Sequence, residues 1–309
     1  YHGGLNIMVS SMTLGSLITY NSLVYYYLTP IRNSLDFYKE FYYVKNSIKR
    51  INNILNYKYE KLDNKTNLNL KGDIIIKNLY FSYNNQDAIL KNINTNIKDK
   101  NKVLILGSSG SGKSTLLKLL YKYYNVKRDC ISINNHDIND YTLKDIRENI
   151  TYISQNEILY NDTIRNNIIL ESDDYIRNIS EEEFLNICKL THITEIINEN
   201  FLSYDYPIEE NGANLSGGQK QRIILARSLL KKSKIILIDE GLNEIDVKLE
   251  RKILNNIFNY YQDKTFIIIS HRLDNIDLYD KVINIDKGTS KEVKINEWNT
   301  RYWNYTKQQ

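Results

Sequence analysis

The sequence contains few cysteines and no excess of one charge, and both shortages exclude classes of protein. Among 309 residues only Cys130 and Cys188 are cysteines, and they lie far apart and outside any metal-ligand spacing. A disulfide framework or a cysteine-rich metal site is therefore not expected, and a reducing compartment fits. The 41 Lys and Arg residues are interspersed with 37 Asp and Glu residues. The electrostatics therefore give no reason to expect a nucleic-acid partner.

The first residue is Tyr1, so no initiator Met is present, and the amino terminus also lacks a signal-peptide pattern. We therefore expect the chain to be the carboxy-terminal part of a longer protein. Hydrophobic residues make up 42% and charged residues 25% of the sequence. This balance is typical of a folded protein and argues against disorder.

Charged residues are absent from positions 3–31, and basic residues follow from Arg32 onward. A helix of about 20 apolar residues can cross the roughly 30 Å core of a bilayer. Serine, threonine and asparagine interrupt the stretch, so hydropathy alone also allows a soluble core helix. The basic flank favours a membrane segment with a cytoplasmic carboxyl end. We therefore predict a transmembrane helix over residues 13–31.

A second helix is predicted over residues 33–56, as the cytoplasmic extension of that span. Apolar residues at positions 41, 44, 48, 51 and 55 recur at spacings of three and four, which gives one apolar stripe. This stripe requires partner helices that the chain does not obviously supply. The polar residues 59–71 are predicted to form a linker.

Beyond the linker, short β-branched runs alternate with helical stretches, which is typical of a sheet covered by helices. The runs occupy residues 74–76, 103–106, 131–133, 151–153, 235–238, 266–269 and 282–285. Between about residues 162 and 215 helical periodicity replaces them. We predict an inserted helical subdomain there.

Residues 107–115 read GSSGSGKST, between one of these apolar runs and a leucine-rich helix. Glycines let successive backbone N–H groups point at phosphate oxygens, and the helix amino terminus adds partial positive charge. Lys113 is predicted to bridge the β- and γ-phosphates, and Ser114 to ligate Mg²⁺. The predicted nucleotide-binding residues of this loop are Gly107, Ser108, Ser109, Gly110, Ser111, Gly112, Lys113, Ser114 and Thr115.

Two adjacent acids, Asp239 and Glu240, end a later apolar run. We predict that Asp239 holds the magnesium shell and that Glu240 is the base for the attacking water. Adjacent strand residues point to opposite faces, so these roles require the strand to end here, which Gly241 favours.

Residues 215–219 read Leu-Ser-Gly-Gly-Gln, 24 residues before Asp239. With the phosphate loop and the acidic pair, this motif makes the chain resemble the ATP-binding-cassette (ABC) transporters over about residues 73–286. The resemblance implies an α/β P-loop NTPase fold, with a RecA-like sheet, an antiparallel β subdomain and an inserted helical subdomain. Residues 72–309 would form this ATP-binding domain, and residues 1–58 the end of a transmembrane domain.

The resemblance also assigns roles to residues outside the phosphate loop. It implies that Tyr83 stacks on adenine, although core or surface packing remains the alternative for this ring. It places Gln155 beside Mg²⁺ or the lytic water, and His271 beside the γ-phosphate and Glu240. Mg²⁺ would thus lie among Ser114, Gln155 and Asp239. The motif residues that contact nucleotide held by a second copy are Leu215, Ser216, Gly217, Gly218 and Gln219.

Within the family, IEENGANLSGGQ and LYNDTIRNNI are most similar to bacterial exporters that fuse membrane and ATPase domains, above all peptide and bacteriocin exporters. This implies an ATPase that uses ATP and Mg²⁺, works as a head-to-tail homodimer and drives transport. Its other partners would be membrane helices of the same transporter and membrane lipid, with the ATPase domain on the cytoplasmic side of the cell membrane.

One family motif is altered, because Asn243, Glu244, Ile245 and Asp246 replace the common Ser-Ala-Leu-Asp. Communication between the two nucleotide sites could therefore differ. Two alternatives stay open: a truncated remnant that binds ATP without transport, and a soluble ABC ATPase that is not a transporter.

Overall fold

The computed structural model describes residues 4, 8–9, 13–57, 60, 66, 68–83, 87–170, 179–199 and 203–293. The chain divides into two compact units, Tyr1–Lys61 and Leu62–Gln309. This division falls within the predicted linker, residues 59–71. Residues 59, 61–65 and 67 of this linker lie outside the described residues.

The first unit contains one long helix, α2 (Leu14–Leu55), which covers both the predicted span and its predicted extension. Thr13 caps its amino terminus by accepting a hydrogen bond from the Ser16 N–H, and Pro30 lies within it. None of its residues is buried. The predicted apolar stripe, Phe41, Val44, Ile48, Ile51 and Leu55, is more than half exposed at every position.

In the part of the chain that the structure describes, no helix combines the length and apolarity that a membrane crossing requires. The predicted span over residues 13–31 does not meet this criterion. Polar residues such as Ser16, Thr19 and Asn21 dilute its apolar ones.

Two sheets form the second unit. The larger sheet has the order β10-β9-β3-β8-β7-β6, and all neighbours are parallel except β9 and β10. Its strands are β3 (Lys102–Leu106), β6 (Ile150–Ile153), β7 (Ile235–Asp239), β8 (Thr265–Ile269), β9 (Lys281–Asp286) and β10 (Thr289–Val293). The smaller, antiparallel sheet has the order β2-β1-β4-β5. Its strands are β1 (Ile74–Phe81), β2 (Leu90–Ile97), β4 (Ile131–Ile133) and β5 (His136–Asp137).

The central strands β3, β7 and β8 of the larger sheet are buried on both faces, which explains why they are nearly continuous apolar runs. Leu104, Ile236 and Ile268 belong to one buried cluster, which includes residues of the helices α9 (Gly217–Leu229) and α10 (Val247–Tyr260). Their strand neighbours, such as Ile105 and Leu237, belong to a second cluster with α3 (Lys113–Leu120) and the antiparallel sheet. The predicted α/β P-loop architecture, with an antiparallel subdomain, is confirmed.

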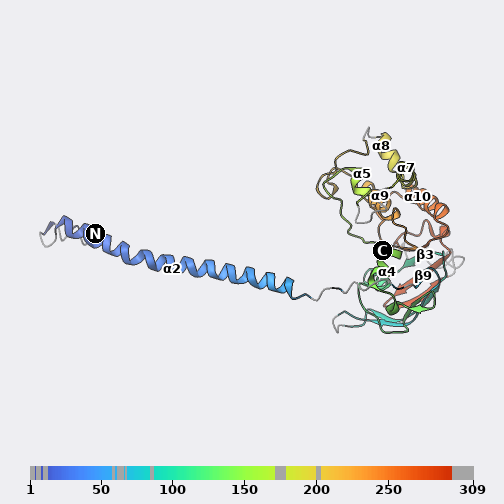
Figure 1. Cartoon of the computed structure of the whole chain (residues 1–309), viewed down its shortest axis with the longest axis horizontal. Helices are drawn as coiled ribbons and strands as arrows, with labels where there is room; N and C mark the ends of the chain where they lie inside the picture. Colours follow the sequence, from blue (N-terminus) through green and yellow to red (C-terminus); the bar gives the residue numbers. More distant parts are fainter. Residues whose placement is uncertain are drawn as a thin grey trace, which may run out of the picture. The chain divides into compact units, whose positions relative to one another are not determined.

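The predicted helical insertion contains α5 (Ile164–Ile168), α7 (Glu181–Leu190) and α8 (Ile193–Glu199). These helices lie together at one end of the second unit, next to α9 and α10, as Figure 1 shows. The described part of this unit also contains α4 (Leu143–Asn149) and the 3-10 helices η1 (Ile138–Asp140), η2 (Glu210–Gly212) and η3 (Ile276–Leu278).

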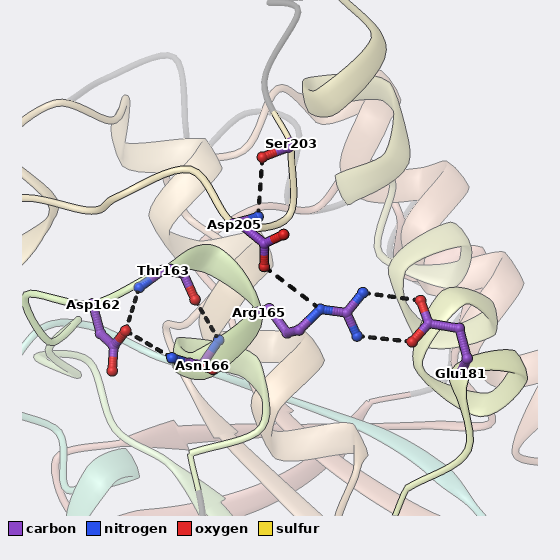
Figure 2. Close-up of polar contacts among 7 residues, drawn as sticks. All are labelled: Asp162, Thr163, Arg165, Asn166, Glu181, Ser203 and Asp205. Carbon is purple, nitrogen blue, oxygen red and sulfur yellow. Dashed lines mark hydrogen bonds and ion pairs between the residues drawn. The ribbon is translucent and has the colours of Figure 1, made fainter.

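Arg165 joins three segments of this helical region. Its guanidinium donates two hydrogen bonds to the Glu181 carboxylate, at 2.8 and 2.9 Å, and lies 3.9 Å from an Asp205 oxygen (Figure 2). The guanidinium carbon also lies 4.3 Å from the centre of the buried Phe184 ring. Arg165 thus joins α5 to the start of α7 and to the segment that contains Asp205.

Replacing Arg165 with alanine is expected to lower the melting temperature by about 4 °C. A cation over an aromatic ring, together with its packed stem, contributes about 1 to 2 kcal/mol. In a domain of this size 1 kcal/mol corresponds to about 2 to 4 °C. Thermal unfolding monitored by circular dichroism measures the shift. Arg251→Ala is the matched control, because Arg251 pairs with Asp277 on the surface. Equal shifts in both variants would contradict the role given to Phe184.

Candidate active site

The phosphate loop joins β3 to α3 and depends on glycine at defined positions. Gly107, Gly110 and Gly112 have φ angles of 147°, 75° and 103°. A Cβ atom at Gly107 would lie 2.0 Å from the Ile285 carbonyl oxygen, so no side chain fits there. Gly112 is the N-cap of α3 and provides no side-chain cap. The first N–H groups of α3 therefore meet no capping side chain, which suits an anionic ligand.

Lys113 lies over this loop with only 5% of its surface exposed. Its ammonium donates hydrogen bonds of 2.9 Å to the carbonyl oxygens of Gly107 and Ser108. Burial lowers the pKa of Lys113, whereas the charges of Glu240 and Asp239 raise it. The loop therefore holds a cation that is electrostatically coupled to the acidic pair.

Asp239 ends β7 and is 3% exposed. Ser114 Oγ donates to Asp239 Oδ1 over 2.9 Å, and the Tyr152 hydroxyl donates to Oδ2 over 2.9 Å. Burial and the Asp239 charge raise the pKa of Tyr152, so this phenol remains a hydrogen-bond donor. Two of the three predicted magnesium ligands, Ser114 and Asp239, are thus in direct contact.

The oxygen atoms of Ser114 and Asp239 suit a hard cation such as Mg²⁺. Within the described ranges, no three His, Cys, Asp or Glu side chains form a metal-binding group. A magnesium ion at this position would therefore also need oxygen atoms from phosphates and water, which is how Mg²⁺ is usually held beside a nucleotide. The donor set fits Mg²⁺ bound together with a nucleotide.

Glu240 follows the end of β7 and turns away from it. Its φ angle is 56°, in the left-handed region that residues with side chains seldom adopt. Its carboxylate accepts a 3.0 Å hydrogen bond from Gln155 Nε2 and lies 2.8 Å from His271 Nε2. The structure thus brings Gln155 and His271, which are remote in sequence, to the carboxylate next to Asp239.

Asn243 is a further contact of Glu240 that sequence reasoning missed. Its side-chain amide donates to Glu240 Oε2 over 3.3 Å. Arg272 holds the same loop by donating to the carbonyl oxygens of Asn243 and Ile245, and to Glu250 Oε2 over 2.7 Å. The altered motif at residues 243–246 therefore contacts the predicted base directly. The sequence signal for this contact was that Asn243 lies three residues after Glu240.

Tyr83 lies beside the phosphate-loop helix, because its hydroxyl is 3.1 Å from Thr115 Oγ1. Its ring makes edge contacts with Phe81 and Tyr124, with centroids 5.0 Å apart in both pairs. Tyr83 is therefore one of three clustered aromatic rings. Its neighbour Tyr124, 41% exposed, was not singled out from the sequence.

The Leu-Ser-Gly-Gly-Gln motif forms the start of α9. Ser216 is the N-cap, its hydroxyl accepts from the Gln219 N–H, and Gln219 Oε1 accepts from the Ser216 N–H over 2.8 Å. Leu215 is almost buried. Across the described ranges, no hydrogen bond joins this motif to the phosphate loop.

The geometry defines a class of protein. In a mainly parallel sheet, the strand β3 ends in a glycine-rich loop that holds the buried Lys113, while Asp239 ends the strand β7 and Glu240 follows it. This arrangement is a P-loop nucleotide-binding domain.

Comparisons with known proteins define the family. Residues 90–243 match the family model described as ABC transporter. The lactococcin-G-processing and transport ATP-binding protein LagD of Lactococcus lactis subsp. lactis is 34% identical over 291 residues, covering 93% of this chain and 40% of the relative. The transport/processing ATP-binding protein ComA of Streptococcus pneumoniae serotype 4 is 33% identical over 289 residues, covering 93% and 40%.

A solved structure agrees with these relatives. The bacterial Atm1-family ABC exporter with ATP bound superposes with a TM-score of 0.71 at 28% identity, over 81% of this chain and 44% of that one. The chain therefore belongs to the ABC transporter family and contains its ATP-binding ATPase domain. It spans about 40% of the length of the curated relatives named above.

Proposed function

We propose that this chain hydrolyses ATP in a head-to-tail homodimer and that hydrolysis drives an exporter of the cell membrane. The observation that carries the proposal is the arrangement around Glu240. Its carboxylate meets Gln155 and His271, and it belongs to the same site as Asp239, Ser114 and the phosphate loop. Such convergence of a base, its polar partners and an anion-binding loop is characteristic of phosphoryl-transfer sites.

In this proposal the phosphate loop and Lys113 bind the β- and γ-phosphates, and Tyr83 stacks on adenine. Ser114, Asp239 and Gln155 hold Mg²⁺, which when bound neutralises phosphate charge. Glu240 accepts a proton from the attacking water while the water oxygen forms a bond to the γ-phosphorus. The bond to the β-phosphate oxygen breaks, and ADP and phosphate result. His271 contacts the γ-phosphate and orients Glu240.

We expect a second copy to be needed because, among the described residues, no hydrogen bond joins the signature motif to its own phosphate loop. The N-terminus of α9, with Ser216 and Gly218, can bind an anion through its N–H groups. In a two-fold dimer the motif of one copy would cover the γ-phosphate held by the other, so the single interface would bury two ATP molecules. ATP binding would close the dimer, and hydrolysis would open it.

The names of the relatives support a proposal for the cargo and the location. LagD is named for processing and transport of lactococcin G, and ComA for transport and processing, so we propose a peptide or bacteriocin cargo. The ATPase domain would act on the cytoplasmic side of the membrane, in contact with lipid-embedded helices of the same transporter. Nucleic acid has no part in this proposal.

The test is ATP hydrolysis by the 309-residue chain, measured with Mg²⁺ across a range of protein concentrations. A dimer predicts that the rate per molecule rises with concentration and then saturates. A rate per molecule independent of concentration would contradict the composite site. An absence of turnover at every concentration would instead favour a remnant that binds ATP without transport.

A further inference from the structure

Tyr152 holds the second oxygen of the Asp239 carboxylate. Its hydroxyl donates to Oδ2 over 2.9 Å, while Ser114 donates to Oδ1 over the same distance. Asp239 is 3% exposed, so each carboxylate oxygen has a hydroxyl partner in a water-poor environment. A carboxylate bound at both oxygens cannot rotate freely about its terminal bond.

The backbone brings Tyr152 to this position through strand pairing. Tyr152 lies in β6 opposite Leu237 of the parallel strand β7. Side chains two residues apart in a strand share a face, so Asp239 lies on the face of Leu237, one step further along. Tyr152 can therefore reach the carboxylate diagonally across the pair.

The ring of Tyr152 has its own support. It stacks on Tyr121, with centroids 5.6 Å apart and an angle of 29° between the rings, and meets Tyr123 edge-on at 5.8 Å. The ring is thus held by aromatic neighbours, and the hydroxyl alone meets Asp239. Phenylalanine would keep the ring and remove only that hydrogen bond.

We propose that Tyr152 is a positioning residue for Mg²⁺, which fixes Asp239 so that its Oδ1 edge faces Ser114. This inference rests on the proposed role of Asp239 in holding Mg²⁺. The tyrosine would act through the Asp239 carboxylate, to which its hydroxyl donates, as outer partners of metal ligands commonly do.

The test measures binding of a fluorescent ATP analogue to the full chain by anisotropy, first in EDTA and then along a Mg²⁺ series. Tyr152→Phe is expected to leave the affinity in EDTA unchanged and to raise the half-saturating Mg²⁺ concentration about tenfold. Tyr121→Phe is the matched control. It also removes a tyrosine hydroxyl, but from the ring that stacks on Tyr152, and that hydroxyl makes no hydrogen bond to Asp239. It should match the wild type in both measurements.

A double variant keeps the test specific for Asp239. With Asp239→Asn in place, adding Tyr152→Phe should cause no further change in Mg²⁺ dependence, because the tyrosine acts through that carboxylate. A further change in the Mg²⁺ dependence of the double variant would overturn the inference. So would a Tyr152→Phe variant whose Mg²⁺ dependence matches the wild type, or one that loses as much affinity in EDTA as it does with Mg²⁺. If nucleotide binding by the wild-type chain did not depend on Mg²⁺, both the proposed metal site and the inference about Tyr152 would be wrong.

Discussion

Replacing Glu240 with glutamine is expected to reduce ATP turnover about a thousandfold while ATP still binds. Removal of a general base costs about 10²- to 10⁴-fold in rate. Glutamine has the same shape and can still meet Gln155 and His271, which contact Glu240 at 3.0 and 2.8 Å. It also removes a negative charge from the neighbourhood of the γ-phosphate. The variant should therefore accumulate as an ATP-bound dimer.

Steady-state phosphate release measures the turnover of Glu240→Gln, and size-exclusion chromatography with light scattering measures its mass with ATP and Mg²⁺. Glu182→Gln is the control, because Glu182 is an exposed glutamate on α7. A variant that remains monomeric with ATP would show the sandwich dimer to be wrong. Turnover close to that of the wild type would remove Glu240 as the base.

Replacing Lys113 with alanine is expected to weaken ATP binding by at least a hundredfold. A hydrogen bond to a charged group contributes about 1.5 to 3 kcal/mol, and the proposed Lys113 contacts involve two phosphates. The ammonium is already held within the loop by the carbonyl oxygens of Gly107 and Ser108. Its charge would therefore meet the phosphates at little cost in side-chain entropy.

Titration with a fluorescent ATP analogue measures this loss, and Lys118→Ala is the matched control on the same helix. Lys118 lies in the last turn of α3 and is partly exposed, so its variant should bind like the wild type. Unchanged affinity in Lys113→Ala would remove the assignment of this loop to phosphate binding.

The sequence was most informative where strands are buried on both faces. All seven predicted apolar runs lie in or overlap strands, from β1 to β9. The strand β2 was missed because its buried positions are interrupted by exposed asparagines and its pairing with β1 is irregular, with Asn78 and Asn92 at positive φ. The strand β10 was missed because it is an edge strand without a buried residue.

The predicted site residues came from motifs, and the structure places several of them in contact. Ser114 meets Asp239, and Gln155 and His271 both meet Glu240. The sequence could not reveal Tyr152, because its contact depends on the register of β6 against β7. Asn243 was visible only as a departure from the family motif. Its contact with Glu240 depends on how Arg272 fixes the loop backbone.

The order of strands in the larger sheet has a consequence during synthesis on the ribosome. Among the described strands, β3, which leads into the phosphate loop, pairs with β8 and β9 and with no other. At about 5 to 20 residues per second, the roughly 160 residues from the end of β3 to the end of β8 take about 8 to 33 s to translate. For that period the nascent chain carries an apolar strand without either neighbour, exposed to chaperones and proteases. A chain released before β8 was made would contain the phosphate-loop sequence but neither of the strands that pair with β3.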